Sequence, residues 1–324
     1  MSSTSAPGSD GRTRPLGRTG VQVSPVCAGG SPLGSMPGLY GREVTEEEGV
    51  ATVRALLASP IRTIDTSNGY SDGQSERRIG RALAEAGGCP DDFVVITKVD
   101  PRDGDYSGDR VRMSVQESKE RLGVDHLPLV HLHDPENFSF EEITRRGGAV
   151  DALVALRESG EIGAVGLAGG RVQEMARYLE LGVFDVLLVH NRWTLLDRSA
   201  GELLRQAQGA GLGLINAAVY GGGLLAGGGV GGTYGYRPAP QEVLDAADRM
   251  RVVCEGHGTD LRTAALQFSL RDARFATTVV GMSRPERVEQ TLAAASTSLP
   301  DELWPQLEAL LPPEQTWLDA PFGD

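Results

Sequence analysis

Four side chains that could transfer protons recur at the ends of short apolar runs of the sequence. Asp65, Lys98 and His133 each come at the end of such a run, and Tyr70 lies in the loop that follows Asp65. The three run ends are spaced about 34 residues apart, and a strand–helix–strand unit takes about 30 residues or more. We therefore expect three neighbouring parallel strands, whose carboxyl ends display all four side chains at one rim.

Together these four groups could protonate and deprotonate an oxygen atom. The phenol of Tyr70 is a poor acid at neutral pH, because its ordinary pKa is about 10. A neighbouring ammonium such as that of Lys98 would lower this pKa, since it favours the phenolate. The Asp65 carboxylate would fix the lysine, and His133 could hydrogen-bond the same substrate oxygen or relay the proton. Such a set suits proton transfer to a carbonyl oxygen while a hydride reaches the carbon, or the reverse reaction.

The rest of the sequence predicts the scaffold that would position these groups. From residue 26 to residue 281, apolar runs typical of strands alternate with segments of helical periodicity. Eight strands with eight crossover helices predict a (β/α)8 barrel of the TIM type. The alternative is an open doubly wound sheet. That sheet would want a GxGxxG turn after its first strand, and residues 29–34 (GGSPLG) do not provide one.

Three local features add detail to the barrel. Thr45, with Glu48 three residues later, is the signature of a capping box and predicts the start of a helix. Asp109 can cap the helix that follows the Lys98 strand. The glycine-rich segment 221–235 lies between two predicted strands. A loop that closes over a ligand is favoured there over a flexible linker.

The ends of the chain differ from its middle. Residues 1–13 (MSSTSAPGSDGRT) lack the apolar segment of a signal peptide, and we expect a disordered tail. Residues 14–324 are expected to form a single barrel domain, since α/β barrels routinely reach this length as one domain. The segments on either side of residues 17–20 predict a small N-terminal hairpin that closes one end of the barrel. Extra helices are expected after the last strand.

The composition is that of an ordinary globular protein, and it argues against several classes of function. A net charge of −13 disfavours a general nucleic-acid surface, because phosphate binding needs basic patches. The three cysteines are far apart and odd in number, which favours a reducing cytoplasm over a disulfide framework. No run of about 18 apolar residues occurs, so no membrane span is predicted. No feature of the sequence indicates the oligomeric state.

Four motifs in sequence order resemble those of the aldo-keto reductases. They are Asp65-Thr66-Ser67 with Tyr70, Ser75-Glu76 with Ile79-Gly80, Thr97-Lys98, and Val124-Asp125 with His131-Leu132-His133-Asp134-Pro135. The His-Asp-Pro version looks most like the branch of sugar (L-fucose, L-galactose and D-threo-aldose) and pyridoxal dehydrogenases. The resemblance extends from about residue 16 to residue 292.

The resemblance implies a role for each of the four rim residues. Tyr70 would be the general acid/base, Lys98 the group that modulates its pKa, Asp65 the partner of the lysine, and His133 the group that orients the substrate. The reaction would interconvert an alcohol and a carbonyl of an aldehyde, a ketone or a sugar lactol, with a nicotinamide cofactor bound at the barrel rim. The residues that would hold this cofactor are Gly30, Asp65, Asn191, Trp193, Tyr220, Gly222, Leu224, Gly281, Ser283, Arg284 and Arg287.

The sequence departs from the family pattern where relatives hold the carboxamide of the nicotinamide. Ala168 and Gly169 stand where relatives often have Ser and Asn, so only backbone groups are available there. His190 stands in place of a glutamine. Trp193, three residues later, could stack on the nicotinamide.

A second departure concerns the phosphates of the cofactor. Gly281 and Met282 stand where relatives have a Lys-Ser pair, and Arg287 matches the arginine on the adenosine side. Arg284 could replace the lost lysine, because a guanidinium suits phosphate oxygens. The expected cofactor is NADP or NAD, with NADP slightly favoured.

Two other classes of function remain open from the sequence. His131 and His133 point to the same side of one strand, so a metal-dependent hydrolase could use both as ligands. The altered carboxamide positions also allow a regulatory barrel that binds the cofactor without turnover. Stoichiometric zinc would favour the hydrolase, and tight cofactor binding without turnover would favour the regulator.

Overall fold

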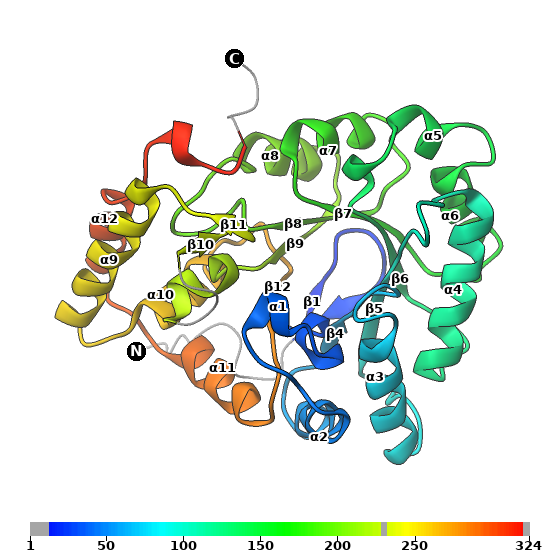
Figure 1. Ribbon diagram of the computed structural model, residues 1–324, viewed down its shortest axis with the longest axis horizontal. Coiled ribbons are helices and arrows are strands. Elements are labelled where there is room, and N and C mark those ends of the chain that lie inside the picture. The colour runs from blue at the N-terminus through cyan, green and yellow to red at the C-terminus, as the bar shows by residue number, and fades with distance from the viewer. Residues whose placement is uncertain (1–12, 228–231, 320–324) are drawn as a thin grey trace.

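The structure is a computed structural model that describes residues 13–227 and 232–319 (Figure 1). Eight parallel strands form a closed barrel in the order β12-β3-β4-β5-β6-β7-β8-β9. This confirms the predicted (β/α)8 barrel. The strands are β3 (Val26–Gly29), β4 (Thr63–Asp65), β5 (Val94–Val99), β6 (Leu129–His133), β7 (Val165–Gly169), β8 (Val186–His190), β9 (Gly213–Ala217) and β12 (Thr277–Gly281).

Helices surround the barrel, as Figure 1 shows. Those that connect or follow the barrel strands are α2 (Glu46–Leu57), α3 (Gln74–Glu85), α4 (Gly108–Leu122), α6 (Ala149–Glu158), α7 (Val172–Leu179), α8 (Gly201–Gly209), α10 (Leu261–Leu270) and α11 (Glu286–Ser296). The additional helices are α1 (Pro37–Tyr40), α5 (Phe140–Thr144), α9 (Gln241–Gly256) and α12 (Leu303–Glu308). Short 3-10 turns are η1 (Ser31–Gly34), η2 (Pro135–Asn137), η3 (Gly221–Ala226) and η4 (Glu314–Thr316).

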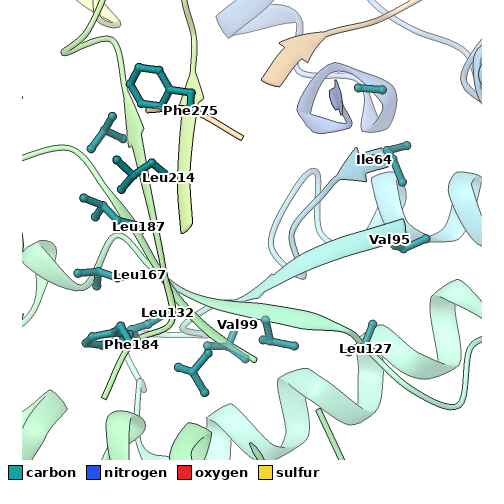
Figure 2. Packing of buried hydrophobic residues seen from close by; sticks show 14 of the residues in the cluster. Ile64, Val95, Val99, Leu127, Leu132, Leu167, Phe184, Leu187, Leu214 and Phe275 are labelled. Carbon is teal, nitrogen blue, oxygen red and sulfur yellow. The ribbon is translucent and has the colours of Figure 1, made fainter. Parts of the chain in front are cut away.

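The strands bury apolar side chains on both faces. Outward-facing residues such as Ile64, Val95 and Leu167 pack in the layer between strands and helices (Figure 2). Ile96 belongs to the separate apolar cluster in the barrel interior. Because successive strand residues point to opposite faces, Lys98 shares the inner side with Ile96. The same alternation directs the charged side chain of Lys98, at the carboxyl end of its strand, towards the mouth of the barrel.

The predicted N-terminal hairpin is confirmed. Strands β1 (Arg14–Pro15) and β2 (Gln22–Val23) pair antiparallel. Leu16 is fully buried in the interior cluster and lies against Gly213, the first residue of β9. The hairpin thus covers the amino end of the barrel, opposite the rim that carries the four candidate residues. The predicted tail falls almost wholly on residues 1–12, which lie outside the described residues.

The local predictions had mixed outcomes. The capping box of α2 is confirmed, since the Thr45 and Glu48 side chains each accept a hydrogen bond from the other residue's backbone N–H. The predicted Asp109 cap is wrong. Ser107 caps α4, because its backbone is extended and its hydroxyl oxygen accepts from the Arg110 N–H at 3.3 Å. Asp109 lies in the first turn of that helix.

Some elements have no counterpart in the sequence analysis. Helix α5 follows the His133 strand in a stretch without clear periodicity. The glycine-rich segment contains η3, and its end pairs with the residues that follow in a small hairpin of β10 (Thr233–Tyr234) and β11 (Arg237–Pro238). None of the helices in the described part of the chain is long and apolar enough to span a membrane.

Candidate active site

A cavity of about 440 Å³ opens at the carboxyl ends of the barrel strands. All four side chains singled out in the sequence lie on its wall, namely Asp65, Tyr70, Lys98 and His133. Asp65, Lys98 and His133 come from the adjacent strands β4, β5 and β6. The spacing along the sequence therefore brings them together as expected.

Lys98 and Asp65 form a buried ion pair at the base of this group. Lys98 Nζ lies 2.5 Å from Asp65 Oδ1, and the two side chains are only 2% and 5% exposed. The ammonium also donates to the Thr66 carbonyl at 2.6 Å. Each charge offsets the desolvation of the other, so loss of one partner would leave an unpaired charge inside the protein. The pair thus fixes a cation at the floor of the cavity.

Tyr70 is placed above this cation by its loop. The loop continues along β5, because the Thr66 N–H donates to the Ile96 carbonyl and the Asn68 N–H donates to the backbone carbonyl of Lys98. Lys98 Nζ then lies 4.8 Å from the centroid of the Tyr70 ring. The phenol is thereby held within reach of the lysine charge.

The expected fall in the pKa of Tyr70 is not found in the protein alone. Burial raises the pKa of the phenol well above its ordinary value, and the Asp65 carboxylate raises it further. The main reason is that the phenolate would lose its hydration inside the protein, and nearby carboxylates disfavour it further. Tyr70 is therefore neutral in the free protein and has a proton to donate.

His133 completes the group from β6. Its ring lies edge-on to that of Tyr70, with centroids 5.7 Å apart. Its backbone N–H donates to the Tyr106 hydroxyl at 2.9 Å, and that hydroxyl donates to the Val99 carbonyl at 2.8 Å. Burial alone would lower the pKa of His133, but the adjacent carboxylates of Asp100 and Asp134 raise it above its ordinary value.

The predicted cofactor residues fall into two sets. Five line the cavity in addition to Asp65, namely Tyr220, Gly222, Gly281, Ser283 and Arg287. The structure does not bring the other five to the cavity wall, namely Gly30, Asn191, Trp193, Leu224 and Arg284.

Trp193 is the clearest member of the second set. Its ring packs on the outer side of the barrel, 6.2 Å from the Phe268 ring and 4.3 Å from the Arg274 guanidinium carbon. Asn191 before it is fully buried and has a φ of 59°, in the left-handed region. This turn directs the chain away from the rim. The structure therefore does not support stacking of Trp193 on a ligand in the cavity.

The other members of the second set have local partners. The Gly30 N–H donates to the Asp65 carbonyl at 2.7 Å. Leu224 packs in the apolar cluster around α9 and α10. Arg284 lies in a neighbouring surface depression with Arg42.

Basic side chains gather where the cavity opens near η3 and α11. Arg42, Arg262 and Arg287 line this end. Arg262 and Arg287 both hydrogen-bond the neutral amide oxygen of Gln290. Burial, and then the nearby Arg262 and Arg284, lower the pKa of Arg287. A cluster of guanidinium groups of this kind is suited to hold a phosphate.

Sequence reasoning missed several groups on or beside the wall. Asp100 follows Lys98 by two residues, so strand alternation was a signal for its inward direction. Asp134 belongs to the motif that suggested the family, but the motif assigned it no role at the cavity. No periodic signal marked Tyr40, which comes from α1, or Tyr236, which directly follows the glycine-rich segment. The positions of these two segments depend on contacts with distant parts of the chain, which a local sequence pattern does not encode.

The described part of the chain offers no set of ligands for the metal site that the sequence left open. No group of three or more His, Cys, Asp or Glu side chains there is arranged to hold a metal ion. His131 is fully buried beneath the cavity, and both its ring nitrogens lack a hydrogen-bond partner among the described residues. Burial, and then Lys98, lower its pKa well below the ordinary value. His131 is thus a neutral core residue beside a fixed cation.

Comparison with known proteins agrees with the geometry. Residues 25–312 match the profile of the Aldo/keto reductase family. L-galactose dehydrogenase from Arabidopsis thaliana is 33% identical over 94% of this chain and 96% of its own. Pyridoxal 4-dehydrogenase from Microbacterium luteolum is 31% identical over 91% of this chain and 96% of its own.

A solved structure supports the fold independently. An aldo-keto reductase from Bacillus halodurans, in its holo form, superimposes with a TM-score of 0.75 at 22% identity. The match covers 93% of this chain and 96% of that one. With the family profile matched over most of its length, the chain belongs to the aldo/keto reductase family and is an NAD(P)-dependent oxidoreductase that interconverts a carbonyl and an alcohol.

Proposed function

We propose that this enzyme transfers a hydride between NADP and a polyhydroxylated substrate of the sugar type, such as a lactol and its lactone. Tyr70 is the general acid/base. The observation that carries this proposal is the convergence of Tyr70, the Lys98–Asp65 pair and His133 on one cavity. These are the groups that proton transfer to a carbonyl oxygen requires.

The roles of these groups follow from their contacts. During reduction, Tyr70 gives its proton to the substrate oxygen as the hydride reaches the carbon. The ammonium of Lys98, 4.8 Å from the Tyr70 ring centroid, stabilises the phenolate left behind. Asp65 holds that ammonium in place. In oxidation the phenolate takes the proton of the alcohol, and the hydride leaves for the cofactor.

We infer that the cavity holds nicotinamide adenine dinucleotide phosphate. The cofactor supplies the hydride donor and acceptor. Gly222 and Gly223 have φ values of 75° and 108°, a left-handed backbone that lets this loop lie close to a ligand. Arg262 and Arg287 would hold phosphate oxygens, and together with Arg42 they favour NADP, which carries an additional phosphate, over NAD.

Polar groups on the wall suit a substrate rich in hydroxyls. Asp134 and His190 both line the cavity, and Asp134 Oδ1 lies 3.9 Å from His190 Nε2, beyond direct hydrogen-bond distance. That oxygen is buried, whereas the Asp134 side chain as a whole is 41% exposed. A substrate hydroxyl could donate to the exposed part of this carboxylate. The names of the two relatives, L-galactose dehydrogenase and pyridoxal 4-dehydrogenase, agree with a small polar substrate.

Cofactor titration followed by a substrate screen tests this proposal. NADPH and NADH are titrated separately by fluorescence. The better cofactor is then assayed at 340 nm, in its oxidised form with aldoses and in its reduced form with aromatic aldehydes and simple ketones. We expect tighter binding of NADPH and turnover with the hydroxylated compounds. Failure to bind either nucleotide would overturn the proposal, and turnover confined to apolar ketones would overturn its substrate class.

The cysteines support a location in a reducing compartment. Cys27, Cys89 and Cys254 are all free, and Cys27 and Cys254 are buried. Burial raises the pKa of the Cys27 and Cys254 thiols, which lowers their reactivity. We infer a cytoplasmic enzyme, and fractionation of the native cells would test this.

A further inference from the structure

Asp100 is a carboxylate directed at the candidate catalytic histidine from the neighbouring strand. It directly follows β5, two residues after Lys98. Its Oδ1 lies 2.7 Å from His133 Nδ1. The side chains of His133 and Asp100 are 16% and 13% exposed, so the contact is mostly shielded from water. No motif of the sequence analysis includes Asp100.

The other oxygen of Asp100 is held as well. The Ser67 hydroxyl and the Gly69 N–H both donate to Asp100 Oδ2, the latter at 2.7 Å. A Cβ on Gly69 would lie 2.9 Å from the Asp100 carboxyl carbon, so only glycine allows this close approach. Ser67 Oγ also lies 3.2 Å from His133 Nδ1. The carboxylate is therefore fixed on both sides and cannot rotate away from the imidazole.

These contacts determine which ring nitrogen carries the proton. Burial alone would raise the pKa of Asp100, but His133 and the donors from Ser67 and Gly69 lower it below its ordinary value. Asp100 is thus a carboxylate at neutral pH and can only accept. His133 Nδ1 must then be a donor, whether the ring is neutral or charged. His133 Nε2, 3.9 Å from Asp134 Oδ2 on the cavity wall, carries a proton only when the ring is an imidazolium.

We propose that Asp100 is a positioning residue that holds the proton of His133 on Nδ1, so that His133 can donate a hydrogen bond to a substrate carbonyl only as an imidazolium. This inference rests on the proposed role of the cavity in carbonyl reduction. In that reaction the hydride goes to the carbonyl carbon and the Tyr70 proton to the oxygen. The imidazolium keeps its own proton and stabilises the negative charge that develops on that oxygen.

Several groups besides Asp100 face His133 and set its charge. Asp134 is its neighbour on the same chain, and Tyr70 lies edge-on to its ring. Lys98 on β5 and the buried His131 on β6 complete the set of titratable groups. Both carboxylates raise the pKa of His133, whereas Lys98 lowers it. Carbonyl reduction is then fully active below this raised pKa and falls as pH increases through it.

The Asp100→Asn variant should change the tautomer of His133, a result that a purely structural role of Asp100 would not predict. An asparagine in the same place can accept from Ser67 and Gly69 through its oxygen while its NH2 group donates to His133 Nδ1. Neutral His133 then carries its proton on Nε2, and a donor to the substrate persists at high pH. A change of tautomer through an exchanged carboxylate is known to alter histidine catalysis in serine proteases.

The tautomer is read by ¹⁵N NMR of histidine-labelled protein, with cofactor and without substrate. Above its pKa, wild-type His133 should carry its proton on Nδ1, and the Asp100→Asn variant should carry it on Nε2. In parallel, kcat/KM for carbonyl reduction should fall about tenfold per pH unit above the His133 pKa in wild type. In the variant it should be flat from about pH 7 to pH 9.

Two controls keep the outcomes separate. Ser67→Ala retains the contact between Asp100 and His133 and should keep both the Nδ1–H tautomer and the pH-dependent fall. NADPH titration reports whether each variant is folded. A wild-type His133 with its neutral proton on Nε2, or an unchanged pH profile in Asp100→Asn, would overturn the inference. Because the tautomer is measured without turnover, failure of the proposed reaction itself would be recognised separately, by turnover that survives in Tyr70→Phe.

Discussion

The two halves of the barrel rim differ in what they present to the cavity. The half formed by β4, β5 and β6 carries ionisable side chains, and each has a partner that fixes it. The part formed by β7, β8, β9, β12 and β3 presents mainly small residues, namely Gly29, Ala168, Gly169, Ala217, Ala218 and Gly281, beside the larger Leu188, His190 and Val279. The first half is built to move a proton, and the second leaves room for a bound molecule. Among the strand ends, the ionisable side chains other than His190 are thus gathered on one side of the rim.

The largest effect is expected from the phenol of the charged half. Tyr70→Phe should lower kcat by about 10²- to 10⁴-fold, because general acid/base catalysis contributes on that scale. NADPH affinity should stay close to that of wild type. Steady-state kinetics and fluorescence titration measure the two quantities. Normal turnover in this variant would remove Tyr70 from the mechanism.

The ion pair of the charged half gives the next largest effect. Lys98→Met leaves the buried Asp65 unpaired and should lower the free energy of unfolding by about 3–5 kcal/mol. Activity should be lost as well. The double variant Asp65→Asn with Lys98→Met removes both charges and should recover much of the stability without activity. Urea unfolding measures these changes, and a single variant as stable as wild type would show that the pair is not coupled.

A smaller effect is expected at the mouth of the open half. Arg287 lines the cavity, whereas Arg284 lies outside it, and the two arginines form a matched pair. Arg287→Ala should weaken NADPH binding by about tenfold, the loss of one charge-assisted hydrogen bond. Arg284→Ala should change binding much less. Equal losses in the two variants would show that the cavity wall does not define the phosphate site.

The smallest effect on cofactor binding is expected for Trp193, whose ring packs outside the cavity. Trp193→Leu should leave NADPH affinity nearly unchanged, because the ring packs against Phe268 and Arg274. The stability should fall instead, through lost packing. A loss of affinity of about tenfold, typical of a large aromatic contact, would restore the stacking hypothesis for Trp193.

The charged half could be predicted from the sequence because its signals are periodic. The spacing of Asp65, Lys98 and His133 matches the repeat of a strand and its crossover helix, and strand alternation aims Lys98 inwards. The same rule would also have selected Asp100. The barrel, its N-terminal hairpin and the Thr45 capping box depend on equally local patterns, and the structure confirms them.

The open half could not be predicted in the same way. Small residues carry no local signal of whether they face a cavity or a neighbouring backbone. The position of Trp193 depends on the left-handed backbone at Asn191, and no pattern in the sequence predicts that conformation. Tyr236 reaches the cavity through the packing of the turn between β10 and β11. The choice between Ser107 and Asp109 as helix cap depends on the backbone conformation of one residue, which neighbouring side chains decide.

Transfer of a labelled hydride tests most directly whether the two halves act on one substrate. The enzyme is incubated with NADPH that carries deuterium at C4 and with the best carbonyl compound of the screen, and the alcohol is analysed by mass spectrometry. With both C4 positions labelled, wild type should place one deuterium on the former carbonyl carbon, and Tyr70→Phe should form almost none of this product. An alcohol without deuterium, or equal labelled product in both proteins, would contradict hydride transfer with Tyr70 as the acid.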